Sequence, residues 1–376
     1  MSFTSLGLSK PLLRVIAKQG YQTPYPIQQE AIPAILAGSD VLGIARTGSG
    51  KTAGYVLPLL ERLQRQRSVD HLQVLVLVPT RELAAQVADV FQTFSASLPR
   101  PLKTVAVFGG VSVNPQLVAF RDADVLVATP GRLLDLLTQR PGKLAKIETL
   151  VLDEADKMLE LGFADELNQV LAQVPVGRQT VLFSATLGEA IQQMNSMLLH
   201  EPVQIQIADE ETPIDQIQQT AYRVTPERKS ALLRHLIKSR KLTQVLVFVS
   251  STRSADNLVA KLGKNGIRAM AMHGHKTQNA RTDSLASFKL GEFPVLVATD
   301  LLARGIDIQF LPHVINYELP RSPKDYIHRI GRTGRADASG EAISLVTPDD
   351  EHHFSIIQKK MGKRIQLIDA ATLSFA

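Results

Sequence analysis

The sequence predicts an α/β protein with two domains in tandem, each a mainly parallel β-sheet flanked by helices. Its length is the first observation, because 376 residues exceed one ordinary domain and suit two of roughly 100–200 residues each. The second observation is that short apolar runs alternate with amphipathic stretches of helical length. The third is that this alternation occurs once in each half of the chain.

In the first half, the apolar runs are continuous and rich in β-branched residues, which is typical of strands buried on both faces. The predicted strands are residues 41–45, 74–78, 104–108, 125–128, 150–152 and 181–183. Residues 81–94 and 131–137 have the apolar spacing of amphipathic helices. Because right-handed strand–helix–strand crossovers connect parallel strands, this order predicts a parallel sheet.

The second half repeats the pattern. Its predicted strands are residues 245–249, 269–272, 295–298, 314–317 and 342–346, and a helix is predicted over about 350–361. The segment VLVATP at 125–130 also recurs as VLVATD at 295–300, although two generic buried strands would explain this likeness equally well.

The expected boundary between the domains is the acidic segment ADEETPIDQ at 208–216, which contains a proline and lacks apolar periodicity. We therefore expect a first domain over residues 1–207, a linker over 208–217 and a second domain over 218–376.

The composition excludes several classes of protein. Without cysteine, the chain has no disulfide scaffold, cysteine-ligated zinc, iron–sulfur cluster or thiol nucleophile. No apolar run approaches the length of about 18 residues that a membrane-spanning helix needs. The first residues also lack the pattern of a signal peptide. The expectation is a soluble cytoplasmic protein.

The net charge of +6 is concentrated in the second half of the chain. Residues 1–207 hold 18 Lys+Arg and 18 Asp+Glu, whereas the remaining residues hold 24 and 18. A basic domain favours a polyanionic partner such as nucleic acid. A solvated surface with no specific partner is the alternative interpretation of charge alone.

The strongest local pattern is ARTGSGKT at residues 45–52, between a predicted strand and a helix. Such a loop cradles phosphates with backbone N–H groups and a helix N-terminus, while Lys51 supplies charge and the Thr52 hydroxyl suits Mg²⁺. Ala45 replaces the first glycine of the general pattern, and a glycine-rich turn with an incidental lysine is the alternative. The candidate nucleotide ligands are Thr47, Gly48, Ser49, Gly50, Lys51 and Thr52.

A phosphate loop of this kind needs a carboxylate at the end of a neighbouring strand, and TLVLDEAD at 149–156 supplies one. Asp153 is placed to hold Mg²⁺, and Glu154 to orient and deprotonate an attacking water. An acidic helix N-terminus without catalytic function would show the same residues.

The segment HRIGRTGR at 328–335 is the third chemical element. Arginine stabilises the charge that gathers on a transferring phosphoryl group through its planar fork of donors. If Arg332 and Arg335 do this, the catalytic site must form between two domains. A structural arginine cluster paired with surface acids is the alternative.

These motifs together resemble those of the DEAD-box RNA helicases of superfamily 2. DEAD itself is residues 153–156, and the match runs in family order from residue 3 to 335. The resemblance implies two RecA-like domains, RNA-stimulated hydrolysis of ATP and a requirement for Mg²⁺. The segment MSFTSLGLSK at the start resembles the bacterial RhlE-like subgroup.

The resemblance also assigns nucleotide contacts outside the phosphate loop. It implies that Gln28 reads the adenine edge with its amide and that Phe3 stacks on the base. In the second domain it implies that Asp307 contacts the ribose, Gly305 approaches the nucleotide, and the two arginines act as arginine fingers. His328 and Arg329 would instead hold their segment together. The chain departs from the usual family pattern at Tyr25 and Arg46.

RNA contacts carry over to hydroxyls, amides, backbone donors and arginines, the groups that bind a sugar–phosphate backbone. They are Pro79, Thr80, Arg81, Gly109, Gly110, Thr129, Arg132, Gln278, Arg281, Thr299 and Asp300. Ser184 and Thr186 match the element that links ATP state to strand separation, although a strand-end cap is the simpler interpretation of these two residues. With no tryptophan and 5% aromatic residues, the chain should bind RNA with little sequence preference.

The expected activity is local separation of short RNA duplexes or remodelling of RNA–protein complexes. An ATP-gated RNA clamp with little unwinding is the alternative, and a metabolic P-loop kinase is a third interpretation. The expected protein is a monomer, and the RhlE-like resemblance suggests ribosome assembly or RNA decay as settings.

Overall fold

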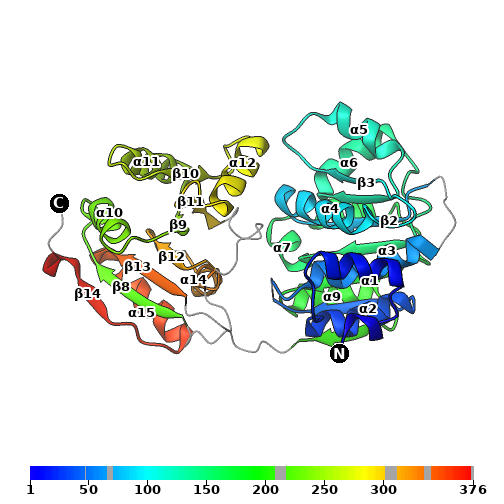
Figure 1. Ribbon diagram of the computed structural model, residues 1–376, viewed down its shortest axis with the longest axis horizontal. Coiled ribbons are helices and arrows are strands. Elements are labelled where there is room, and N and C mark those ends of the chain that lie inside the picture. Colours follow the sequence, from blue (N-terminus) through cyan, green and yellow to red (C-terminus); the bar gives the residue numbers. More distant parts are fainter. Residues whose placement is uncertain (47, 66–70, 208–216, 301–310, 334–339, 374–376) are drawn as a thin grey trace. The chain divides into compact units, whose positions relative to one another are not determined.

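The computed structural model describes residues 1–46, 48–65, 71–207, 217–300, 311–333 and 340–373, and within α12 it leaves out the side chains of residues 278 and 279. The chain divides into two compact units, Met1–Asp209 and Glu210–Ala376 (Figure 1). The expected linker at 208–216 lies outside the described residues. No described helix is long and apolar enough to cross a membrane.

The first unit is a seven-stranded sheet with the order β3-β4-β2-β5-β6-β1-β7. Every neighbouring pair is parallel, as the continuous apolar runs predict. The strands are β1 Val41–Ile44, β2 Val74–Leu77, β3 Thr104–Val107, β4 Val125–Ala128, β5 Thr149–Leu152, β6 Gln179–Ser184 and β7 Val203–Gln206.

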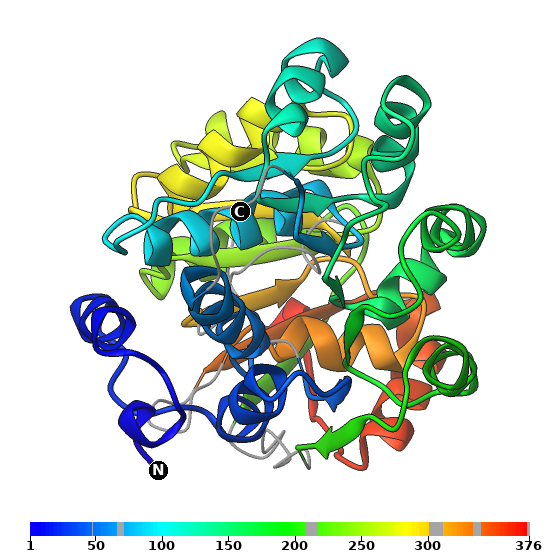
Figure 2. The same ribbon diagram turned by 90° about the vertical axis from the view of Figure 1, so that its right-hand side faces the viewer.

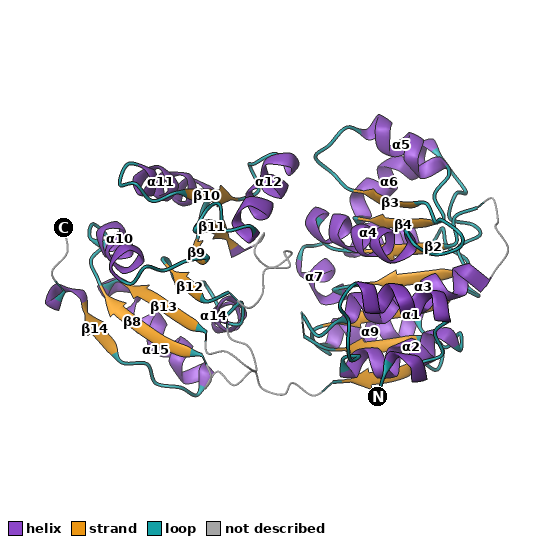
Figure 3. Ribbon diagram, viewed as in Figure 1, coloured by secondary structure: helices purple, strands orange, loops and turns teal. Residues whose placement is uncertain are grey.

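Helices cover both faces of this sheet (Figures 2 and 3). On one face lie α1 Lys10–Lys18, α2 Pro26–Leu36, α3 Lys51–Arg65 and α4 Arg81–Ser95, with the short 3₁₀ helix η1 Phe3–Ser5. On the other lie α5 Val113–Arg121, α6 Pro130–Gln139, α7 Ala155–Glu160, α8 Ala164–Leu171 and α9 Glu189–Leu198. Along a central strand such as β2, valines face the first layer and leucines the second, which explains why both strand faces are apolar.

The second unit repeats the architecture, with seven parallel strands in the order β10-β11-β9-β12-β13-β8-β14. They are β8 Gln218–Arg223, β9 Val245–Val249, β10 Ala269–Met272, β11 Val295–Thr299, β12 His313–Asn316, β13 Glu341–Val346 and β14 Leu367–Asp369. Its helices are α10 Lys229–Ser239, α11 Thr252–Gly263, α12 Gln278–Lys289, α14 Pro323–Ile330 and α15 Glu351–Met361, with the 3₁₀ turns η2 Pro348–Asp350 and η3 Ala370–Thr372.

All eleven predicted strands are present, and the predicted helices over 81–94, 131–137 and 350–361 correspond to α4, α6 and α15. Three strands were not predicted: β7, β8 and β14. They carry polar residues and are only partly buried, so they lack the continuous apolar run that identified the others. The fold class is confirmed.

Candidate functional site

Strand order decides which candidate residues meet in the first unit. Because all strands are parallel, their carboxyl ends share one edge, where open α/β sheets bind ligands. The neighbours β5, β6 and β1 end at this edge in Asp153, in Ser184 and in the phosphate loop, so three segments distant in sequence converge. The neighbours β3, β4 and β2 end beside them and lead into the candidate RNA segments.

The phosphate loop turns tightly between β1 and α3. Gly48 and Gly50 both have a φ of +86°, a left-handed conformation that favours glycine. Lys51 begins α3 and is buried, and its ammonium donates to the carbonyl oxygens of Ala45 at 2.5 Å and Arg46 at 3.3 Å. Burial lowers the pKa of Lys51, while the carboxylates of the DEAD segment act to raise it.

Two further atoms of the loop bear on ligand binding. The Ser49 hydroxyl is buried with no hydrogen-bond partner, which leaves it able to bind a phosphate oxygen. Thr52 lies on the first turn of α3, three residues before Tyr55. Thr47 lies outside the described residues.

Asp153 is 2% exposed, and its two carboxylate oxygens differ. Oδ2 accepts a hydrogen bond from the Tyr55 hydroxyl at 2.9 Å, whereas Oδ1 is buried without a partner. Burial raises the pKa of Asp153 to about 6, and the positive charge of Lys51 opposes that rise. A buried carboxylate oxygen without a hydrogen-bond partner, such as Asp153 Oδ1, is a suitable ligand for a hard cation.

Glu154 has the left-handed backbone conformation, with φ 53° and ψ 47°, directly before α7. Such a conformation costs a non-glycine residue of order 1–3 kcal/mol, and it occurs where surrounding contacts impose it, often at functional sites. Its Oε2 pairs with the Lys157 ammonium at 2.8 Å, and both side chains are largely buried. The candidate general base is thus held by a cation one turn along the chain.

Ser184 and Thr186 connect to the DEAD segment. The Ser184 hydroxyl, fully buried, donates to the Thr186 carbonyl at 2.8 Å and accepts from the Thr186 N–H at 3.2 Å. The Thr186 hydroxyl in turn donates to Asp156 Oδ2 at 3.3 Å. This pair therefore closes its own turn, as a strand-end cap does, and also contacts the segment that carries the candidate catalytic carboxylates.

The adenine-reading segment packs against the phosphate loop. Gln28 is fully buried; its amide oxygen accepts from the Tyr25 N–H at 3.0 Å and its amide nitrogen donates to the Gly50 carbonyl at 2.9 Å. A Cβ at Gly50 would lie 2.5 Å from that nitrogen, so only glycine fits. Phe3 is buried edge-to-face against Tyr21, with ring centroids 6.4 Å apart.

The candidate RNA residues of the first unit meet at the carboxyl ends of β3, β4 and β2. The guanidinium of Arg81 packs against Gly109 and Gly110, where a Cβ on Gly110 would lie 1.8 Å from its Nη1. Arg132 donates to the Val111 carbonyl at 3.1 Å, which joins a third segment to these two. Thr80, after Pro79, caps α4 by accepting from the Leu83 N–H at 3.2 Å, and Thr129 precedes α6.

In the second unit, Arg329 is the centre of a polar cluster. Its guanidinium bonds both oxygens of Asp300, at 2.5 and 2.7 Å, and also bonds Asn316 and the Glu318 carbonyl. These contacts confirm that Arg329 holds its segment together. Asp300, expected to contact RNA, is occupied by this pairing and is only partly exposed.

The remaining candidates of the second unit are less completely described. Thr299 ends β11, and Arg281 and Arg332 are buried. Gln278 begins α12, but its side chain is not described. Gly305, Asp307 and Arg335 lie outside the described residues.

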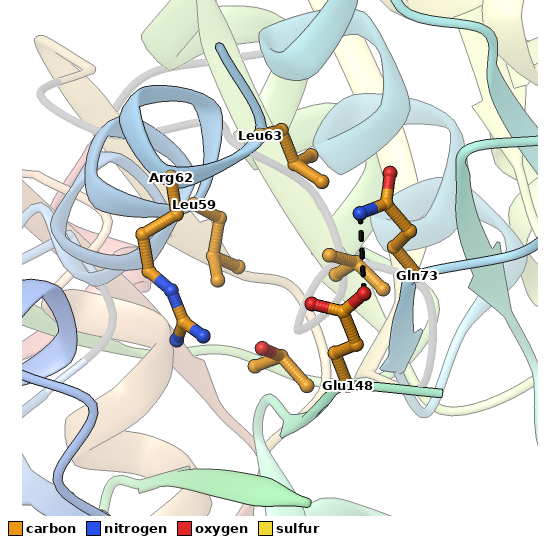
Figure 4. A pocket seen from close by; sticks show the side chains of 7 residues that line it. Leu59, Arg62, Leu63, Gln73 and Glu148 are labelled. Carbon is orange, nitrogen blue, oxygen red and sulfur yellow. Dashed lines mark hydrogen bonds between the residues drawn. The ribbon is translucent and has the colours of Figure 1, made fainter. Parts of the chain in front are cut away.

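One pocket lies at the opposite end of the first sheet (Figure 4). Its lining residues are Leu59, Arg62, Leu63, Gln73, Val74, Glu148 and Thr149. Thr149 begins the strand that ends beside Asp153, so the length of β5 separates this pocket from the site described above.

Comparison with known proteins decides the family. Residues 25–194 match the family model of DEAD/DEAH box helicases, and residues 227–337 match the helicase conserved C-terminal domain. An ATP-dependent RNA helicase CshA of Listeria monocytogenes is 38% identical over 371 residues, covering 98% of this chain and 71% of the relative. This chain belongs to the DEAD-box ATP-dependent RNA helicases.

Other relatives and solved structures agree. A DEAD-box ATP-dependent RNA helicase CshA of Streptococcus pneumoniae is 40% identical over 374 residues, covering 99% of this chain and 71% of its own length. S. cerevisiae Dbp5 bound to RNA and ADP BeF3 is 32% identical with a TM-score of 0.84, covering 98% of this chain and 95% of that structure. A DEAD box protein from Methanococcus jannaschii is 34% identical with a TM-score of 0.55, covering 98% and 99%.

The helicase is therefore an enzyme that binds nucleotide and RNA and couples ATP hydrolysis to work on RNA. Family membership overturns the interpretation as a metabolic kinase. The RhlE-like subgroup stays a prediction, because the two bacterial relatives above carry the name CshA.

Sequence reasoning missed two residues of this site. Tyr55 lies in a largely apolar stretch of α3, but it follows Thr52 by three residues and so shares its helix face. Lys157 follows Glu154 by three residues at the start of α7, a spacing that could have suggested the ion pair.

Proposed function

We propose that the helicase binds the triphosphate of ATP at the carboxyl ends of β1, β5 and β6 and hydrolyses it there in response to RNA. The observation that carries this proposal is that Lys51, Asp153 and Glu154 are all buried at the same edge of the sheet, where β1, β6 and β5 end side by side. Glycine-lined backbone donors and a buried lysine suit phosphates, and a carboxylate beside them suits the metal that accompanies ATP.

Asp153 and Thr52 are the residues proposed to hold Mg²⁺. The orphaned Asp153 Oδ1 supports this, because a buried carboxylate oxygen without a donor needs a cation or water. Among the described residues, no group of three His, Asp or Glu side chains forms a metal site by itself. Mg²⁺ commonly takes one or two protein oxygens and completes its shell with water and phosphate oxygens, so two protein ligands suffice. When bound, it supplies positive charge to the β- and γ-phosphates.

The protein groups then have separate tasks. Lys51 binds phosphate oxygens after its ammonium leaves the Ala45 carbonyl. Glu154 orients the attacking water and accepts its proton, while Lys157 pairs with its Oε2. Arg332 and Arg335 would stabilise the charge on the transferred phosphoryl group, as the sequence predicts. Gln28, Phe3, Gly305 and Asp307 keep their predicted roles toward adenine and ribose.

RNA is proposed to bind along the ends of β3, β4 and β2. Arg81, the Gly109–Gly110 turn and Arg132 are already held together there, so they offer guanidinium and backbone donors as one preformed surface. The second domain would add Gln278, Arg281, Thr299 and Asp300. Such contacts bind the sugar–phosphate backbone of RNA and therefore give little sequence preference.

The Asp156–Thr186–Ser184 hydrogen bonds are proposed to couple the two halves of this edge. They join the ends of β5 and β6, the strands beside the RNA segments on one side and the phosphate loop on the other. Closure of the two domains on a bent single strand would then open a few base pairs of a short duplex, and ATP hydrolysis would return the protein to its open state.

Monomeric state, cytoplasmic location and roles in ribosome assembly or RNA decay stay predictions.

The test compares two assays on the purified chain with short RNA duplexes. ATP hydrolysis should rise several-fold with RNA and not with DNA of the same sequence, and ATP should release the shorter strand. ATP-dependent RNA binding without strand release would instead support the clamp. Hydrolysis indifferent to RNA would contradict the proposal.

A further inference from the structure

Tyr55 is a fully buried polar residue that none of the sequence motifs above explains. It lies on the second turn of α3, packed against the Phe183 ring with centroids 5.8 Å apart. A phenylalanine would fill this apolar space equally well, and a buried hydroxyl costs free energy unless it is hydrogen-bonded. The presence of the hydroxyl must therefore be explained by the group to which it donates a hydrogen bond.

The printed partner of that hydroxyl is a proposed magnesium ligand. The hydroxyl donates to Asp153 Oδ2 at 2.9 Å, and the other proposed ligand, Thr52, lies three residues before Tyr55 on the same helix. One hydroxyl thus links a residue of α3 to the end of β5.

The hydrogen bond from Tyr55 determines which Asp153 oxygen remains available to a metal ion. With Oδ2 engaged, the Asp153 oxygen without a partner is Oδ1. Thr52 and Tyr55 are three residues apart, so they share one face of α3, and the bond fixes that face against β5. A hydrogen bond to the second oxygen of a ligating carboxylate is a common way to orient a metal ligand and raise affinity.

We propose that Tyr55 is a positioning residue for magnesium-bound nucleotide, whose hydroxyl holds the Asp153 carboxylate in register with the helix that carries Thr52. The proposal rests on the proposed function of the site. It predicts that the hydroxyl is needed for the metal-dependent part of nucleotide binding and not for the metal-independent part.

The test measures binding of a fluorescent ADP analogue to the purified chain over a range of Mg²⁺ concentrations. Tyr55→Phe should bind the analogue normally without Mg²⁺ but need about tenfold more Mg²⁺ for half of the metal-induced gain, the scale seen when ligand-orienting groups are removed. In RNA-stimulated hydrolysis, the Mg²⁺ concentration for half-maximal rate should rise similarly, with the RNA concentration for half-maximal rate unchanged.

Two variants separate positioning from packing. Tyr326→Phe removes another buried tyrosine hydroxyl, bonded to Ser344 at 3.0 Å in the second unit, and should keep the wild-type Mg²⁺ dependence. Phe183→Leu disturbs the packing of the Tyr55 ring while keeping its hydroxyl, and should lower the melting temperature more than it changes Mg²⁺ dependence.

Asp153→Asn distinguishes failure of this inference from failure of the proposed site. If Asp153→Asn abolishes the effect of Mg²⁺ on ADP binding while Tyr55→Phe matches wild type, the site stands and the positioning role is overturned. If Asp153→Asn keeps the full Mg²⁺ effect, the site itself is wrong. A Tyr55→Phe protein too unstable to bind ADP without Mg²⁺ would assign the hydroxyl to stability alone and also overturn the proposal.

Discussion

At the scale of single residues, the site is organised by buried groups whose partners are incomplete. Asp153 keeps one orphaned oxygen, and Glu154 is held in a left-handed backbone conformation. Both are costly in a protein without ligand, and the neighbouring hydroxyl of Tyr55 and ammonium of Lys157 offset part of that cost. The carboxylate oxygen without a partner and the strained backbone therefore mark the two residues that we propose act on the ligand.

Glu154→Gln should leave ATP binding intact but lower turnover by about 10² or more, the scale of a lost general base. The measurement is RNA-stimulated phosphate release, with ATP affinity measured separately. Glu160→Gln is the control, because Glu160 lies at the opposite end of α7 from Glu154. Near-normal turnover of Glu154→Gln would remove the residue from its role.

At the scale of elements, close approach of Arg81 to the Gly109–Gly110 turn shapes the proposed RNA surface. Gly110 has a φ of +81°, and a Cβ there would overlap the Arg81 guanidinium. Gly110→Ala should therefore displace Arg81 and weaken RNA binding about tenfold, measured by titration of a labelled single strand, while ATP binding persists.

Gly142→Ala is the matched control for this prediction. Gly142 has a φ of +77°, but a Cβ there would meet nothing within 4 Å. Both variants share a backbone penalty of about 1 kcal/mol, so only the first should affect RNA. Equal RNA affinities in the two variants would show that Arg81 does not depend on the turn.

A second element-scale prediction concerns the amino end of β13. Glu341 accepts two hydrogen bonds from Arg240, at 2.8 and 2.9 Å, and His313 lies 3.4 Å away. Burial acts to raise the pKa of Glu341, but these partners outweigh it and leave the pKa below its ordinary value. The carboxylate therefore binds its proton less readily in the folded state than in the unfolded state, and its stabilisation exists above pH 4.5 and is lost as pH falls through the lowered pKa.

Glu341→Gln should accordingly lower the thermal stability of the second unit at pH 7, and the difference from wild type should shrink below about pH 4.5. Melting curves across pH test this. Glu292→Gln, at an exposed position of the same unit, controls for loss of a charge. A destabilisation that stays constant down to pH 3 would contradict an ionic origin.

At the scale of the whole molecule, the basic excess of the second half predicts how RNA binding responds to salt. RNA affinity should fall by orders of magnitude between about 50 and 200 mM salt, because phosphate contacts release counterions. Arg132→Gln should make the log–log slope shallower by about one unit. A flat salt response would contradict recognition of the backbone.

The two units also divide the predicted catalytic groups between them. Arg335→Ala should keep ATP and RNA binding but slow hydrolysis by about 10³ or more, as expected for an arginine that stabilises the transferred phosphoryl group. Arg321→Ala, at an exposed position of the same unit, is the control. Unchanged turnover in Arg335→Ala would argue against a site shared between the domains.

The sequence by itself determined the fold class, eleven of the fourteen strands in the described part of the chain and the residue types of the candidate site, because buried parallel strands and phosphate loops depend on local composition. It could not identify β7, β8 and β14, whose polar residues are stabilised by pairing with neighbours.

Only the tertiary structure decided which partners each site residue has. The bond from Tyr55 to Asp153 spans 98 residues, and the packing of Arg81 on Gly110 joins two different loops. Such contacts depend on the order of strands in the sheet, which a linear pattern of apolar residues does not encode. That order therefore brings the motifs to one edge of the sheet, with the proposed nucleotide residues on one half and the proposed RNA residues on the other.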